Sequence, residues 1–200
     1  WPVDAVVGEN GAFYFVYDQS KRKITRRFWK SKIERTADRK RLEKIQKKIL
    51  TTVKGSAVAS DQAYREADLA IDYCEDITPL PKSAVDKIVN VFLKAGAVAK
   101  ISSIHVNGWF GDYDKLKMTR ILLGEYFQLD DAEFMGKIVF TGDSPNDEPM
   151  FNYFKNSVGV GNIINYADQI KHFPAWVTTK NTAEGFSELA DKLLSAKAGS

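Results

Sequence analysis

The sequence predicts an α/β protein built from a parallel α/β layer and a separate α+β lobe. From Lys115 onward, helical patterns alternate with short apolar strand patterns, which is typical of a parallel sheet covered by helices. Between about residues 20 and 107 the pattern changes to strands mixed with two helices. The apolar run 138–140 leads into Gly142-Asp143, which indicates a buried strand that ends at a sheet edge.

The composition is that of a globular chain. Hydrophobic residues make up 44% and aromatic residues 12% of the 200 residues, enough for a substantial core. No apolar run is long enough to span a bilayer and no signal peptide is evident, so we expect a cytoplasmic protein with no membrane partner. The single cysteine, Cys74, excludes an internal disulfide and is expected to be a small core residue.

The positive charge is concentrated in one stretch. Residues 21–48 hold 14 lysines and arginines against three acids, a net charge of +11 in a chain whose total is +3. Such a run can attract nucleic acid or anionic substrates. However, Leu42, Ile45, Ile49 and Val53 recur at helical spacing, which favours the solvated face of an amphipathic helix. No nucleic-acid-binding motif accompanies the run, so we expect no nucleic-acid partner.

In the first half of the chain, turn and breaker residues separate the expected elements. Asn10-Gly11 between two apolar runs predicts a hairpin or a tight turn. The break at Pro79-Leu80-Pro81 precedes a helix that Gly96 ends. We expect strands over 3–7, 12–17 and 67–73, a strand or loop over 24–29, and helices over 35–53 and 82–95.

In the second half, one strand carries the two polar residues His105 and Asn107. The apolar pattern over 98–106 predicts a single strand on which Ile101, Ser103, His105 and Asn107 share a face. His105 beside Asn107 could reach a polar ligand, although a lone strand histidine is more often structural. We then expect a loop over 108–114, strands over 138–140, 158–160 and 176–178, and helices from Lys115, from Ser144 and over 185–194.

The stretch Asp143-Ser144-Pro145-Asn146-Asp147 is the most informative part of the sequence. Serine and proline suit the cap and first turn of a helix, which places both acids between a strand end and a helix start. Ligands bind at this edge of open α/β sheets, and clustered carboxylates there suit Mg2+. An ordinary helix start with acids favoured by the helix dipole is the alternative.

Several short motifs, in order along nearly the whole chain, resemble those of haloacid dehalogenase-superfamily phosphatases. The likeness is greatest to the sugar-phosphatase branch with a large α/β cap, including sucrose-phosphate and mannosyl-phosphoglycerate phosphatases. It implies a Rossmann-like core over 1–19 and 108–200 with an inserted α+β cap domain over 20–107. The motifs are Asn10-Gly11-Ala12, Asp114-Lys115, Gly142-Asp143-Ser144-Pro145-Asn146-Asp147, Val160-Gly161-Asn162 and Glu184-Gly185-Phe186.

The resemblance implies a Mg2+-dependent phosphomonoester hydrolase, with a sugar phosphate or other small phosphate ester as substrate. Asp143 and Asp147 would be metal ligands and Asn146 a catalytic partner. Lys115, with Lys117 as the competing candidate, would contact the phosphoryl group as a point charge. The expected substrate-binding residues are His105, Asn107 and Asn162.

One motif of the family has no counterpart here. The nucleophile and general acid of the family lie in an Asp-x-Asp-x-Thr/Val motif after the first strand, and Asp112-Tyr113-Asp114 has the wrong position and context for it. Without a carboxylate nucleophile no aspartyl phosphate can form. We therefore expect these 200 residues to be a truncated form that is inactive alone.

Other functions fit the same residues. A phosphomutase, or a phosphatase of nucleotides or cofactors, would share the fold. A non-catalytic anion-binding or regulatory module is a different class, but such a module has no physical need for Asp143, Asn146 and Asp147 together. The sequence is compatible with a monomer or a homodimer.

Overall fold

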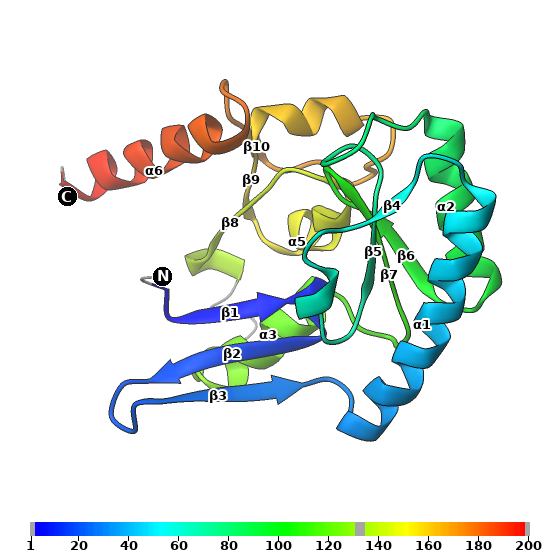
Figure 1. Cartoon of the computed structure of the whole chain (residues 1–200). Coiled ribbons are helices and arrows are strands. Elements are labelled where there is room, and N and C mark those ends of the chain that lie inside the picture. Colours follow the sequence, from blue (N-terminus) through cyan, green and yellow to red (C-terminus); the bar gives the residue numbers. More distant parts are fainter. Residues whose placement is uncertain (1–2, 131–134, 199–200) are drawn as a thin grey trace. The chain divides into compact units, whose positions relative to one another are not determined.

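The computed structural model describes residues 3–130 and 135–198. The chain divides into two compact units, Trp1–Ile121 and Leu122–Ser200, and each is described by itself (Figure 1). The domain boundaries after residues 19 and 107 stay a prediction. None of the helices in the described ranges is both long and apolar enough to cross a bilayer.

The first unit opens with a small antiparallel sheet in the order β1-β2-β3. The turn between its first two strands is the short 3-10 segment η1, Glu9–Gly11, in which all three residues have positive φ angles. The predicted hairpin is therefore confirmed. Gly11 is required because a Cβ there would collide with the carbonyl oxygen of Asp114. The strands are β1 (Ala5–Gly8), β2 (Phe13–Asp18) and β3 (Lys23–Phe28).

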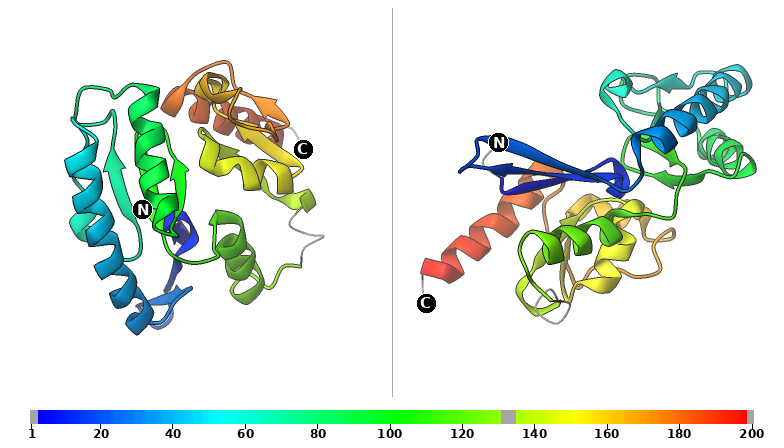
Figure 2. Two further views of the ribbon diagram at one scale, coloured as in Figure 1. Left: turned by 90° about the vertical axis from the view of Figure 1, so that its right-hand side faces the viewer. Right: turned by 90° about the horizontal axis from the view of Figure 1, so that it is seen from below.

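A second antiparallel sheet follows, in the order β4-β5-β7-β6. Two helices, α1 and α2, lie along the same side of this sheet (Figures 1 and 2). Their apolar stripes and the facing strand residues form one core cluster. The elements are α1 (Lys32–Thr52), β4 (Ala57–Val58), η2 (Gln62–Tyr64), β5 (Leu69–Asp72), α2 (Lys82–Lys94), β6 (Val98–Ile101) and β7 (His105–Trp109).

Local sequence explains where the two helices begin and end. Ser31 and Glu34 form a reciprocal capping box at the start of α1. Gly96, with a φ of 74°, lies just beyond α2 and ends the helix. The amphipathic interpretation of the basic stretch is confirmed, because the four residues at helical spacing, Leu42, Ile45, Ile49 and Val53, are all buried.

The single strand predicted over 98–106 is wrong: the segment is a hairpin of β6 and β7. Ser102 closes its turn, with its N–H and its hydroxyl both donating to the carbonyl of His105, at 2.8 and 3.0 Å. Ile104 continues the apolar pattern through the turn, so the sequence gives no sign that the chain reverses direction there. Strand β7 continues to Trp109, into the expected loop.

The second unit contains a parallel sheet in the order β10-β9-β8, as predicted from the alternation of helix and strand. Phe140 packs against Phe151 and Phe154 beneath it. Helix α3 (Lys115–Glu125) runs across the boundary between the units. The remaining elements are β8 (Val139–Gly142), η3 (Pro145–Asp147), α5 (Glu148–Tyr153), β9 (Asn156–Gly159), η4 (Gly161–Tyr166), β10 (Trp176–Val177) and α6 (Thr182–Ala198).

Candidate functional site

The acidic turn follows the C-terminal end of β8, as the sequence predicts. Asp143 comes directly after the strand, and Ser144 in extended conformation begins the short helical turn η3. Asn146 and Asp147 lie within that turn, which α5 then continues. Asp143 and Asn146 are half-buried, whereas Ser144 and Asp147 are buried.

Hydrogen bonds within the turn converge on Asp147. Its Oδ2 atom accepts the N–H of Asp143 at 3.1 Å and the hydroxyl of Ser144 at 3.4 Å. The Ser144 hydroxyl also lies 2.8 Å from Oδ1 of Asn146. The Asp147 carboxylate therefore holds the turn closed.

Asn162, which lies just beyond the neighbouring strand, contacts Asp143. It follows Gly161 at the beginning of η4, just beyond β9. Its Nδ2 atom donates to Oδ2 and to the carbonyl oxygen of Asp143, both at 3.4 Å. An open groove beside these residues is lined by Thr141, Asp143 and Thr182, among others.

The turn has the donor chemistry that Mg2+ prefers, namely carboxylate and amide oxygens. In the described part of the chain, no group of three or more His, Cys, Asp or Glu side chains is placed to hold a metal ion. Mg2+ in phosphate-handling sites commonly takes one or two carboxylates and keeps several waters. Asp143 and Asp147 therefore fit a partial Mg2+ shell.

The two candidate lysines lie at the start of α3. The N–H of Lys117 donates to Oδ1 of Asp114 at 2.8 Å, which makes Asp114 the cap of this helix. The Lys117 ammonium pairs with the exposed Asp112, and this hydrogen bond raises the pKa of Lys117. Lys115 is half-buried. Lys117 thus has an acidic partner of its own, and the assignment of the phosphoryl contact to Lys115 stays a prediction.

His105 and Asn107 are both buried on one face of β7, two residues apart. Nε2 of His105 lies 2.8 Å from Oε2 of Glu75. The Oδ1 atom of Asn107 is buried and has no hydrogen-bond partner among the described residues. An unpaired buried carbonyl oxygen costs free energy of folding.

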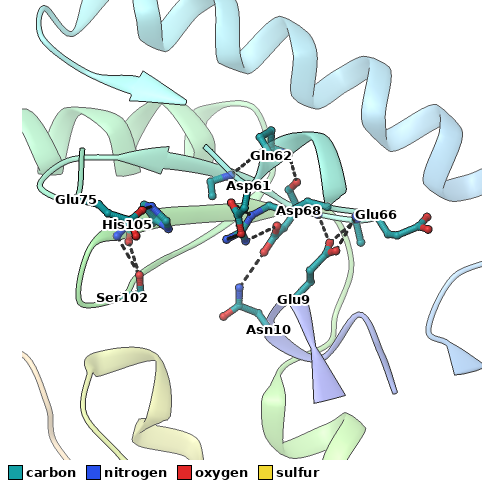
Figure 3. A network of polar contacts seen from close by, with 12 residues as sticks. Glu9, Asn10, Asp61, Gln62, Glu66, Asp68, Glu75, Ser102 and His105 are labelled. Atoms are coloured by element: carbon teal, nitrogen blue, oxygen red, sulfur yellow. Dashed lines mark hydrogen bonds and ion pairs between the residues drawn. The ribbon is translucent and has the colours of Figure 1, made fainter. Parts of the chain in front are cut away.

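A further polar cluster in the first unit connects the β1–β2 turn to the segment before β5 (Figure 3). The Glu9 carboxylate accepts the N–H groups of Glu66 and Ala67, each at 2.6 Å, and that of Asp68 at 3.0 Å. Burial, together with the nearby Asp68, raises the pKa of Glu9 in spite of these bonds.

The acid at the centre of this cluster, Asp68, is fully paired. Arg65 forms ion pairs with Asp68 at 3.0 Å and with Asp61 at 2.8 Å, and Nδ2 of Asn10 donates to Asp68 at 3.0 Å. Burial raises the pKa of Asp68, while Arg65 and Asn10 act in the opposite direction. The motif residue Asn10 therefore takes part in a hydrogen-bond network that links the β1–β2 turn to Asp68.

The structure brings Asp143, Asn146, Asp147 and Asn162 together in the second unit, as expected of a site. It places His105 and Asn107 on one strand face of the first unit, and Lys115 at the first position of α3. Sequence reasoning missed the bond between Asn162 and Asp143. The motif Val160-Gly161-Asn162 indicated that Asn162 belongs to the site, but it did not indicate that Asn162 bonds to Asp143.

One family model matches part of the second unit. A family model described as haloacid dehalogenase-like hydrolase matches residues 122–189, which include the acidic turn and Asn162. No curated protein sequence matches the chain significantly.

Three solved structures show the same fold. Protein 0175 of Thermoplasma acidophilum is 21% identical, with 92% of this chain and 70% of that one covered and a TM-score of 0.59. The sucrose-phosphatase of Synechocystis sp. PCC6803 is 13% identical, with 96% and 75% covered and a TM-score of 0.62. A sugar phosphatase of HAD subclass IIB is 12% identical, with 96% and 76% covered and a TM-score of 0.55. Residues 122–189 are therefore similar to haloacid dehalogenase-like hydrolases, and the chain shares the fold of these three structures.

Proposed function

We propose that this protein is a Mg2+-dependent phosphomonoester hydrolase that acts on sugar phosphates. The observation that carries the proposal is the acidic turn: a half-buried Asp143 stands at the end of β8 in a segment that matches hydrolases of this family. Strand ends of this kind are where open α/β sheets bind ligands.

The proposed reaction has two steps. A carboxylate nucleophile attacks phosphorus, the alcohol leaves with a proton, and water then hydrolyses the aspartyl phosphate to release inorganic phosphate. Asp143 and Asp147 would hold Mg2+, which neutralises charge on the phosphoryl oxygens when it is bound. Asn146 supports the site through its bond with Ser144, and Lys115 supplies a second positive charge.

Sugar phosphates are the preferred substrate class because two structural neighbours are a sucrose-phosphatase and a sugar phosphatase. We propose that Asn107 and His105 contact the hydroxylated part of the substrate.

The nucleophile is proposed to lie outside these 200 residues. The family resemblance calls for an Asp-x-Asp pair after a strand, and the only such pair here caps α3 and binds Lys117. The 200-residue chain alone is therefore proposed to be inactive, while the complete gene product turns over.

Phosphate release from a panel of sugar phosphates, nucleotides and cofactor phosphates tests the proposal. Mass spectrometry first fixes the length of the intact gene product, which is then assayed beside the 200-residue chain with millimolar Mg2+ and with EDTA. We expect Mg2+-dependent release by the intact product, and a loss of about 100-fold or more in kcat/KM for Asp143→Ala.

Asp191→Ala is the matched control, because Asp191 is an exposed acid on α6 of the same unit. We expect its kcat/KM to equal that of the wild type. Absence of turnover of every ester by the intact product contradicts phosphatase activity. Turnover that is equal in the wild type and Asp143→Ala contradicts the role of the acidic turn.

A further inference from the structure

Asn162 is fixed in place by its backbone neighbours. The N–H of Gly161 donates to the carbonyl of Lys180 at 3.1 Å and to Oγ1 of Thr178 at 3.0 Å. On the other side, the N–H of Val160 donates to the carbonyl of Gly142, the residue before Asp143, at 2.9 Å. The main chain at Asn162 is thus tied to β8 and to the segment that leads into α6.

Both ends of the Asn162 amide are used. Its Oδ1 accepts the N–H of Thr182, the first residue of α6, at 3.0 Å, and its Nδ2 faces Asp143. The reverse orientation of the amide would set an oxygen against the Asp143 carboxylate and an NH2 group against the Thr182 N–H. Two repulsive contacts would replace two hydrogen bonds, so the network determines the orientation.

The start of α6 is itself anchored, so the bond from Thr182 gives Asn162 a rigid support. Glu188 on α6 accepts the N–H groups of Thr179 and Lys180, at 3.0 and 3.1 Å. Gly185 packs so closely that a Cβ there would collide with the carbonyl oxygen of Lys180. These contacts leave the Thr182 N–H little freedom to move.

We infer that Asn162 is a positioning residue that holds the Asp143 carboxylate in the orientation required for binding Mg2+. The inference rests on the proposed function and goes beyond a substrate contact. A neutral amide donor orients a carboxylate without competing with the metal for its charge. Partners of metal ligands commonly act in this way, and their loss typically costs 10- to 100-fold in metal affinity.

The first test needs no metal. In the NMR spectrum of the 200-residue chain, the side-chain amide signals of Asn162 are expected to move on Asp143→Ala, because the acceptor is lost. The signals of Asn156, whose Nδ2 donates to the carbonyl of Gly136 instead, should stay in place. If the Asn162 signals do not move, Asn162 does not hold Asp143 and the inference is wrong.

The second test measures Mn2+ binding by EPR as a substitute for Mg2+. Asn162→Ala is expected to weaken binding by about 10- to 100-fold. Asn156→Ala, the same substitution on strand β9 of the same unit, should bind as the wild type does. Melting temperatures of both variants show whether the chain stays folded. A folded Asn162→Ala variant with wild-type affinity overturns the inference.

The two failures remain distinguishable. Mn2+ binding that Asp143→Ala does not weaken contradicts the proposed metal site, whatever Asn162 does. In that case the NMR comparison still decides whether Asn162 holds Asp143. If Asp143→Ala weakens Mn2+ binding and Asn162→Ala does not, the proposed metal site is supported and the positioning role of Asn162 is refuted.

Discussion

Gly142 and Asp147 are so close that a side chain at position 142 cannot fit: a Cβ built there would lie 2.7 Å from Oδ2 of Asp147. That oxygen also accepts the N–H of Asp143. The glycine at the end of β8 is therefore what allows the acidic turn to close.

Gly142→Ala is expected to open the turn. Overpacking of this kind costs about 1–3 kcal/mol in the free energy of unfolding, and the displaced Asp147 would no longer hold the Asp143 N–H. Urea denaturation and Mn2+ binding measure the two effects. Gly124→Ala in α3 is the control, because nothing lies within 4 Å of a Cβ added there. Equal losses for both substitutions would contradict the steric argument.

Asp72→Asn is expected to change the pH dependence of stability. Asp72 is buried, and its carboxylate accepts the N–H groups of Cys74, Glu75 and Asp76. Burial alone would raise the pKa of Asp72, but these bonds outweigh it and lower the pKa below its usual 3.8. A carboxyl with a lowered folded-state pKa stabilises the fold above its unfolded-state value, and this contribution is lost as the pH falls.

Urea unfolding between pH 3 and 7 checks this expectation. At pH 7 Asp72→Asn should cost about 1 kcal/mol in the free energy of unfolding, since an amide accepts these bonds less strongly. The difference from wild type should shrink as the pH falls through 3.8, where the Asp72 carboxyl of the unfolded chain is half protonated. Asp86→Asn, on the exposed side of α2, should show no such trend. A difference that is constant with pH would refute the assignment.

Asn107→Leu is expected to weaken substrate binding without lowering the stability of the fold. Leucine has a similar shape and removes the buried unpaired Oδ1, so stability should be unchanged or higher. If a sugar hydroxyl donates to this oxygen, KM should rise by about tenfold in the intact gene product, the value of one hydrogen bond. The exposed Asn90→Leu on α2 should leave KM unchanged. An unaltered KM for Asn107→Leu would show that Asn107 does not contact the substrate.

Lys115→Ala and Lys117→Ala are expected to differ in activity. If Lys115 contacts the phosphoryl group, its loss should lower kcat/KM of the intact product by about 100-fold or more. The reason is that a positive charge that stabilises the transition state is removed. Lys117→Ala should change kcat/KM by less than about threefold, since its partner is the exposed Asp112. Steady-state kinetics with one sugar phosphate compares them. The reverse ranking would assign the role to Lys117.

Most of the fold was predictable because its signals are local. The spacing of Leu42, Ile45 and Ile49 predicted the buried face of α1, and Asn10-Gly11 predicted the hairpin. The acidic turn was predictable for the same reason, since a strand pattern, a serine at the N-cap position and a proline follow one another directly, although the Ser144 side chain makes no capping hydrogen bond.

The features that sequence reasoning missed depend on partners far away in the chain. The reversal at Ser102 was hidden because its turn is closed by one side chain rather than by glycine or proline. The bond between Asn162 and Asp143 joins residues 19 positions apart, and no local pattern predicts which acceptor an asparagine will find.

The contact of Glu9 with the segment before β5 has a consequence for local unfolding. The amides of Glu66, Ala67 and Asp68 lie outside helices and strands, where hydrogen exchange is usually fast. Their hydrogens are instead held by a carboxylate from the β1–β2 turn. If Glu9 releases these amides only when the hairpin detaches, the three amides should exchange as slowly as neighbouring strand amides. The hairpin and the four-stranded sheet would then open as one cooperative unit, although they belong to separate sheets in the described part of the chain.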